Sequence, residues 1–180
     1  MPGLPTSPPR RAPDPNPPRA WPVGIAVCVL VLLPTLYLAG LTGAGVITRR
    51  LTGDAYHFLA IARKSVATTF YTYDGLHATN GFHPLWQYFL GTSFKWLNIT
   101  SHQAQATYAG WTSLLALAAG VAFGAAAIVR VTRSRFLGLL TVPGIYYLLI
   151  GAHYHNQAVW EIHDGMESGF AVLCGGLVLW

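Results

Sequence analysis

The chain has 180 residues, of which 53% are hydrophobic and 9% are charged, and its formal net charge at pH 7 is +5. Soluble domains carry about 25% charged residues, so this composition excludes an ordinary water-soluble fold and indicates a membrane protein. The positive charge does not indicate nucleic-acid binding, because the Lys and Arg residues flank apolar stretches and form no basic patch interleaved with aromatic residues.

Residues 1–22 contain most of the prolines together with Arg10, Arg11 and Arg19. Such a segment buries too little apolar surface to fold, so we expect a disordered cytoplasmic tail. The uncharged run 23–47 follows, and it is long enough for a transmembrane helix, since about 20 residues cross the hydrocarbon core. A cleaved signal peptide is the alternative, but its apolar region is shorter, about 7–15 residues, and further apolar segments follow here.

The second half of the chain predicts more spans. Residues 104–129 and 136–152 are uncharged, and the basic loop 130–135 between them belongs in the cytoplasm by the positive-inside rule. The apolar run 169–180 is too short to cross a bilayer. We therefore expect an all-α polytopic transmembrane bundle, with residues 23–180 as the N-terminal part of a longer transmembrane domain. Its expected location is the plasma (inner) membrane, multi-pass, with the N-terminus in the cytoplasm.

The apolar segment 84–97 decides the topology, because it is short and carries Lys95. If it crossed the bilayer, the basic loop 130–135 would lie outside; if it lies in the interface, both basic segments are cytoplasmic. We choose the interfacial interpretation. The outer segments are then 48–103 and 153–168, which hold all seven histidines and five of the six acidic residues, Asp54, Asp74, Glu161, Asp164 and Glu167. This distribution predicts an extracytoplasmic site.

The first outer loop opens with an amphipathic pattern. Ala55, Phe58, Leu59 and Ala62 follow helical spacing and predict a helix over 53–66 lying on the outer leaflet. Asp54 falls in its first turn, where helix capping and compensation of the helix dipole are sufficient reasons for an acidic residue. A carboxylate beside His and Arg at a membrane interface is also well placed as a general base.

Two turn signals follow, Asp74-Gly75 and Asn80-Gly81, and they predict a structured loop that leads into the helix over 84–97. In the simplest interpretation Trp86 is an interfacial aromatic anchor. In the second outer loop Glu167 directly precedes an apolar run, so its simplest role is to cap the next helix.

Three motifs in order carry a resemblance to a known family: Gly53-Asp54-Ala55-Tyr56, then Thr-Asn-Gly-Phe-His-Pro-Leu-Trp at 79–86, then Gly165-Met166-Glu167-Ser168. From about residue 44 onward the chain resembles the N-terminal part of GT-C-type integral membrane glycosyltransferases. These are related to protein mannosyltransferases, aminoarabinose transferases and mycobacterial arabinosyltransferases. In that family an acidic residue follows the first transmembrane helix, at the start of a large outer loop with juxtamembrane helices. Asp54 matches this place, although the family often has two acids there and this chain has Gly53 before it.

The resemblance implies transfer of a sugar from a polyprenyl-phosphate donor to an acceptor hydroxyl at the extracytoplasmic face, with inversion. Asp54 would be the catalytic base, and cations would stabilise the departing phosphate. The resemblance does not decide whether a divalent metal, Mg²⁺ or Mn²⁺, takes part in the reaction. The expected partners are the lipid-linked donor, a glycan, lipid or protein acceptor and the bilayer, with no nucleic acid. The expected substrate-binding residues are His57, Arg63, Lys64, Asp74, Asn80, His83, Lys95, Asp164 and Glu167.

Two other kinds of protein stay open as alternatives. The first is a non-catalytic scaffold or a transporter-like protein. Transport favours ionisable groups near the bilayer midplane, and the predicted spans contain none. A His-rich metal- or haem-binding membrane protein is the second. Haem ligation in a bundle needs histidines on facing transmembrane helices, and no histidine lies within a predicted span.

Overall fold

The computed structural model describes residues 19–43, 45, 48, 51, 53–68, 71–79, 84–144 and 168–180. Of these residues 82% are helical and none lies in a strand, which confirms the all-α class for this part of the chain. The α-helices of at least five residues in the described ranges are α1 (Trp21–Thr42), α2 (Gly53–Ala67), α3 (Pro84–Trp96), α4 (His102–Thr132), α5 (Arg135–Leu139) and α8 (Ser168–Leu179).

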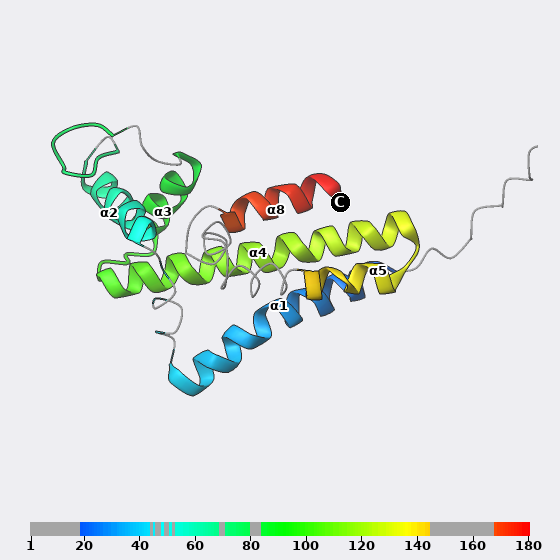
Figure 1. The fold of residues 1–180 in the computed structure, drawn as a ribbon. Helices are drawn as coiled ribbons and strands as arrows, with labels where there is room; N and C mark the ends of the chain where they lie inside the picture. Colours follow the sequence, from blue (N-terminus) through cyan, green and yellow to red (C-terminus); the bar gives the residue numbers. More distant parts are fainter. Residues whose placement is uncertain are drawn as a thin grey trace, which may run out of the picture.

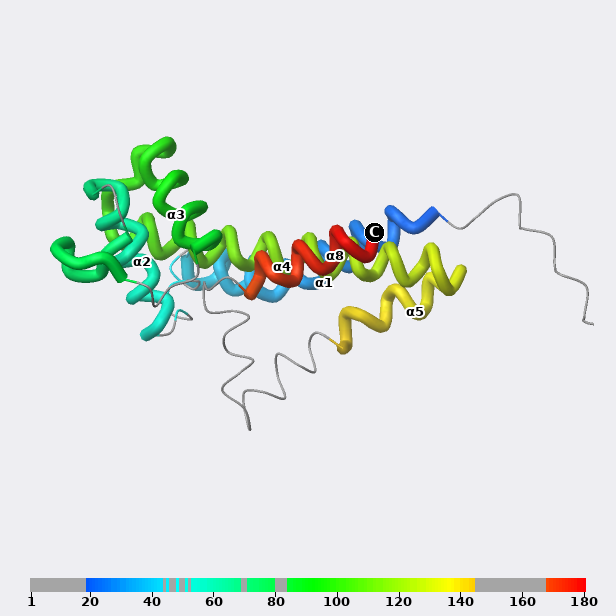
Figure 2. The backbone as a smooth tube through the Cα atoms, turned by 90° about the horizontal axis from the view of Figure 1, so that it is seen from above, coloured from blue at the N-terminus to red at the C-terminus, as the bar shows by residue number. Residues whose placement is uncertain are grey.

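The long helix α4 is the axis on which the other helices pack. Figures 1 and 2 show that α1 runs antiparallel to α4, whereas α8 runs parallel to it. Helices α2 and α3 lie together beside the N-terminal end of α4, and α5 lies near its C-terminal end. The start of α1, the end of α4 and α5 are therefore at one end of the molecule, and α2 and α3 are at the other.

Two helices are long and apolar enough to cross a membrane, α1 with 22 residues and α4 with 31. At 1.5 Å per residue they measure about 33 and 46 Å, against a hydrocarbon core of about 30 Å. Helix α1 starts two residues before the predicted span, inside the predicted tail, and ends at Thr42 instead of residue 47. Its early start is possible because Pro22 sits in the first turn, where a missing N–H costs nothing.

The third predicted span, 136–152, is described only as far as residue 144, and the rest lies outside the described residues. Its first half is not one continuous helix, because α5 ends at Leu139 and a turn at Leu140 precedes a second helical piece at 141–144. Pro143 explains the break, since it has no N–H to donate to the carbonyl of Leu139 and its ring crowds that carbonyl. The fourth predicted segment is helical, as α8.

Both predicted interfacial helices exist, over 53–67 and 84–96, but their surroundings differ from the prediction. Ala55, Leu59 and Ala62 are buried as expected, together with Ile61. This face packs against α3 and the start of α4 instead of a lipid surface, in a cluster that contains Leu59, Ala62, Trp86, Leu90, Phe94, Ala106 and Ala109. Trp86 is 1% exposed, so it is a core residue and not an interfacial anchor.

Helices α4 and α8 cross at small residues. A Cβ atom added to Gly120 of α4 would lie 2.5 Å from the backbone carbonyl carbon and oxygen of Val172 in α8. Gly169 and Gly176 of α8 would meet the backbone of Ser113 and Gly120 in the same way. Small residues that let two backbones approach are typical of helix contacts in membranes. On the opposite side, α4 packs against α1 in a cluster with Val23, Val27, Val31, Leu117, Ala118, Val121 and Ala125.

Candidate functional site

A cavity of about 450 Å³ lies against the first half of α2. We call it the Asp54 cavity; its lining residues are Asp54, His57, Phe58, Ile61, Tyr73 and Thr79. The four residues from α2 are spaced by three, one and three positions, which puts them on one helical face. The other two come from the loop 71–79. The structure thus brings the predicted base Asp54 and the predicted ligand His57 into one cavity.

Tyr73 connects the loop to α2. Its hydroxyl lies 3.0 Å from Nδ1 of His57, and the two rings are 5.3 Å apart between centroids. The ammonium of Lys64 lies 6.0 Å from the centre of the Tyr73 ring, at the outer limit of a cation–π contact. Tyr73 therefore brings one further predicted residue, Lys64, to the vicinity of the cavity. Sequence reasoning missed Tyr73, although its position directly before the Asp74-Gly75 turn was a usable signal.

Asp74 holds the loop 71–79 together. Its Oδ1 accepts hydrogen bonds from the Thr72 hydroxyl (3.0 Å) and from the backbone N–H groups of Leu76 (2.8 Å) and His77 (2.9 Å). Its Oδ2 lies 2.8 Å from Nδ1 of His77. The loop turns at Gly75, whose φ of +90° favours glycine. An antiparallel bridge between Thr72 and Ala78 closes the loop.

These hydrogen bonds have an electrostatic consequence. The backbone N–H and the ring of His77, followed by the N–H of Leu76, hold the pKa of the Asp74 carboxyl well below its usual range. The Asp74 carboxylate was predicted to bind substrate. In the structure its oxygens accept hydrogen bonds from residues of the same loop. These hydrogen bonds fix the shape of the loop that carries Tyr73 and Thr79 to the Asp54 cavity.

Arg63 was also predicted to bind substrate, and it instead joins α2 to the start of α4. Its Nε donates to Oε1 of Gln105 (2.9 Å), and its Nη1 lies 2.6 Å from Nε2 of His102. Arginine carries only donors, so Nε2 of His102 is the acceptor and its ring proton sits on Nδ1. Gln105 in turn binds the segment before α4, because its Nε2 donates a hydrogen bond to the carbonyl of Ile99 (2.8 Å).

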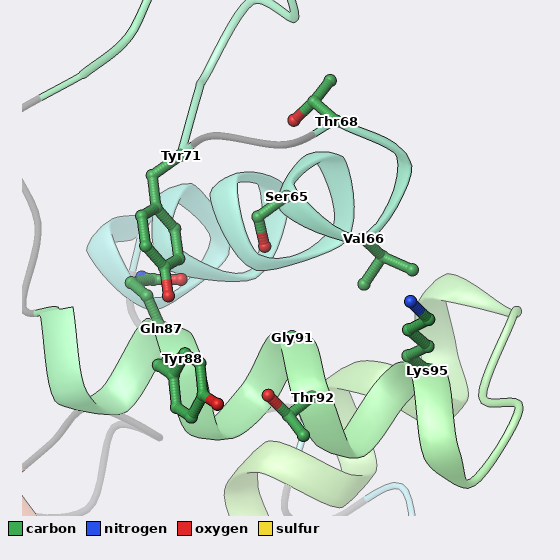
Figure 3. Close-up of a pocket in the computed structure, with 9 residues that line it drawn as sticks. All are labelled: Ser65, Val66, Thr68, Tyr71, Gln87, Tyr88, Gly91, Thr92 and Lys95. Carbon is green, nitrogen blue, oxygen red and sulfur yellow. The ribbon is translucent and has the colours of Figure 1, made fainter.

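A second cavity, of about 380 Å³, lies between the C-terminal half of α2 and α3 (Figure 3). We call it the Gln87 cavity; it is lined by Ser65, Val66, Thr68, Tyr71, Gln87, Tyr88, Gly91, Thr92 and Lys95. Ser65 follows Asp54 by eleven residues on α2, a rise of about 16 Å. Lys95, predicted to share a site with Asp54, therefore belongs to this separate cavity.

The other predicted ligands, Asn80, His83, Asp164 and Glu167, lie outside the described residues. Within the described ranges no three His, Cys, Asp or Glu side chains come together in a way that could hold a metal ion. The Asp54 cavity itself offers one carboxylate and one imidazole. These two groups alone do not make up a metal site, and we assign no step to a metal.

Comparisons of the chain with protein-family models, with curated proteins and with solved structures find no match. The function has to be inferred from the motifs and from the geometry of the two cavities.

Proposed function

We propose that the chain belongs to a membrane glycosyltransferase that moves a sugar from a polyprenyl-phosphate-linked donor to an acceptor hydroxyl at the extracytoplasmic face. One observation carries the proposal. Asp54 and His57 line a single cavity at the end of the molecule where α2 and α3 pack, opposite the end that carries Arg19 and the segment 130–135.

The distribution of charge supports the orientation only weakly, because α2 and α3 carry three described cations, Arg63, Lys64 and Lys95, and the opposite end carries four. Arg19 precedes α1, and three more arginines lie from the last turn of α4 to the first residue of α5: Arg130, Arg133 and Arg135. All four are therefore at the end opposite α2 and α3. The positive-inside rule makes that end cytoplasmic if α1 and α4 cross the membrane. Its aromatic residues fit an interface as well, because the Arg130 guanidinium lies 4.4 Å from the ring centre of Trp180, which contacts Trp21. The Asp54 cavity then opens on the outer side.

The proposed chemistry uses Asp54 as the general base. Its carboxylate takes the proton of the acceptor hydroxyl while the hydroxyl oxygen forms a bond to the anomeric carbon. The bond from that carbon to the phosphate oxygen breaks on the opposite side, and its electron pair leaves with the polyprenyl phosphate. The configuration of the sugar is therefore inverted. Asp54 is exposed at the start of α2, which suits a base that meets a membrane-borne donor and an acceptor from outside.

Two neighbouring groups have supporting roles in this proposal. Lys64, held near the cavity beside Tyr73, would stabilise the negative charge on the departing phosphate. When the Tyr73 hydroxyl donates to Nδ1 of His57, the ring carries its proton on Nε2 and can donate it to a substrate oxygen. Arg63 is not assigned to the phosphate, because its guanidinium is already bound to Gln105 and His102.

The test is a transfer assay in membrane vesicles that contain the full chain. The donors are polyprenyl-phosphate-linked mannose, glucose and arabinose with a radiolabelled sugar, and the readout is label in a product that has lost the lipid. Asp54→Asn should lower the turnover number by about 10²-fold or more, because it removes the base without changing the shape of the side chain. Gln103→Leu, at an exposed position on α4, is the control and should leave transfer unchanged.

Two results would contradict the proposal. One is the absence of transfer with every donor by a wild-type chain that is folded in the vesicles. The other is undiminished transfer by Asp54→Asn, which would remove Asp54 from the role of base.

A further inference from the structure

Gln87 is a buried polar residue whose amide is not used by the described part of the protein. Its side chain is 0% exposed, and neither Oε1 nor Nε2 has a hydrogen-bond partner among the described residues. A buried polar group left without a partner costs about 1–3 kcal/mol. Gln87 lines the cavity between α2 and α3, so a bound molecule could supply both missing partners.

A second glutamine of the same fold, Gln105, serves as a comparison because its amide has a structural role. Gln105 is also buried, at 3% exposure, yet its Oε1 accepts from Arg63 and its Nε2 donates to the carbonyl of Ile99. Buried side-chain polar atoms in folded proteins are bonded in the large majority of cases. The unused amide of Gln87 is therefore an exception that needs a reason, and among the described residues it shares this state with the buried indole Nε1 of the neighbouring Trp86.

The rest of the Gln87 cavity is rich in hydrogen-bonding groups. In Figure 3 Tyr71, Gln87 and Tyr88 gather at one end, and the Lys95 ammonium lies at the other. The hydroxyls of Ser65 and Thr92 lie between these two ends. Burial, followed by the nearby Tyr88, raises the pKa of the Tyr71 hydroxyl, which is protonated at neutral pH even at the ordinary tyrosine pKa of about 10.

Gly91 lets α3 approach α2 closely. A Cβ atom at this position would lie 2.9 Å from Oγ of Ser65 and 3.4 Å from the carbonyl oxygen of Ala62. A side chain on α3 at this point would push against Ser65, which lines the cavity. Its volume of about 380 Å³ is within the range of small-molecule sites, about 300–1,000 Å³.

We propose that the Gln87 cavity binds a small anionic polyol, with neighbouring hydroxyls on the Gln87 amide and the anionic group beside Lys95. A hydroxyl group both donates and accepts, so a pair of hydroxyls satisfies Nε2 and Oε1 together. An apolar molecule would leave both atoms without partners, and a bare anion would face the Oε1 acceptor. Lys95 adds a point charge that suits a phosphate or a carboxylate.

This site is distinct from the Asp54 cavity. Asp54 and Ser65 are separated by about three turns of α2, a rise of about 16 Å, so one small ligand does not contact both. The proposal therefore goes beyond sugar transfer at Asp54 and does not depend on it.

The test measures binding to the purified full chain in detergent by isothermal titration calorimetry. The probes are glucose 6-phosphate, glucose and inorganic phosphate. We expect saturable binding of glucose 6-phosphate that is tighter than binding of either other probe. Lys95→Met should reduce the affinity for glucose 6-phosphate to that for glucose, because it removes the cation and keeps most of the aliphatic stem.

Gln87→Leu separates a binding role from a structural role. The apolar side chain removes two unbonded polar atoms from the interior, so the melting temperature should rise. Its affinity for glucose 6-phosphate should nevertheless fall by about tenfold or more, since two hydrogen bonds to the ligand are lost. Gln103→Leu, the exposed control, should change neither quantity.

Three results would overturn the proposal: glucose 6-phosphate that binds no tighter than glucose and phosphate, a Gln87→Leu variant that binds it as well as the wild type, or a Gln87→Leu variant with a lower melting temperature. None of these results depends on transfer. A failure here is therefore distinguishable from a failure of the proposed glycosyltransferase activity.

Discussion

The hydroxyl of Tyr73 and Nδ1 of His57 lie 3.0 Å apart although sixteen residues separate them in the chain. This contact places the loop 71–79 over the first half of α2 and gives the Asp54 cavity a second wall. The loop can form such a wall because Asp74 and the Thr72–Ala78 bridge fix its shape locally. The cavity thus depends on two short elements that are each stabilised by their own hydrogen bonds.

Tyr73→Phe should reduce sugar transfer if the His57 ring has to be oriented. The variant keeps the ring contact and removes the hydroxyl, so His57 loses its partner on Nδ1 and samples other orientations and tautomers. We expect a fall of about tenfold in the turnover number, with little change in the melting temperature, because the contact is exposed. A Tyr73→Phe variant with full activity would show that His57 needs no orientation by Tyr73.

Asp74 should govern the pH dependence of the loop. Its pKa is lower in the folded chain than in the unfolded chain, so the charged carboxylate stabilises the loop at every pH above the usual Asp value of about 3.9. This stabilisation is lost only as the pH falls through the lowered pKa. In NMR spectra of the detergent-solubilised chain, the amide shifts of Leu76 and His77 should report a midpoint below the usual value for Asp.

Asp74→Asn is the matched control for that titration. The amide keeps one acceptor oxygen but has no titrating proton and no charge to offer the His77 ring. The acidic transition in the Leu76 and His77 signals should disappear in this variant. If the transition persists, it belongs to another group.

Arg63→Met should destabilise the junction of α2 and α4. The substitution keeps an aliphatic stem but leaves the buried Oε1 of Gln105 without its donor and removes the contact with His102. The free energy of unfolding should fall by about 1–3 kcal/mol. Arg135→Met, at an exposed position beyond α4, is the control and should shift the thermal midpoint much less. An equal shift in both variants would refute the structural role of Arg63.

Local patterns predicted the two helices around the cavities within one residue at each end, but they did not predict what covers them. The spacing of Ala55, Leu59 and Ala62 identifies an apolar face and is compatible with either a lipid surface or a protein partner. The choice depends on α3, whose Trp86 and Leu90 pack against that face. Such contacts between distant segments are not encoded in the periodicity of either helix.

The site residues divide in a similar way. Asp54 and His57 could be grouped from sequence because they are three positions apart on one helix. The partner of Arg63, Gln105, is 42 residues away, and no motif indicates this pairing. Gln87 was not singled out, because a single amide in an apolar segment carries no signal until its burial and its missing partners are known.

Gly120→Ala and Gly124→Ala form a matched pair that tests the packing of α4 against α8. Both glycines lie in the same helix, where alanine is intrinsically preferred by about 1 kcal/mol. A Cβ atom at Gly124 would meet nothing within 4 Å, so Gly124→Ala should raise the thermal midpoint in detergent. At Gly120 the added atom would lie 2.5 Å from the backbone of Val172, which cannot rotate away, so α8 has to move. Gly120→Ala should therefore be destabilising by about 1–3 kcal/mol despite the better helix propensity. If both variants were stabilised alike, α8 would not pack on α4 through this glycine.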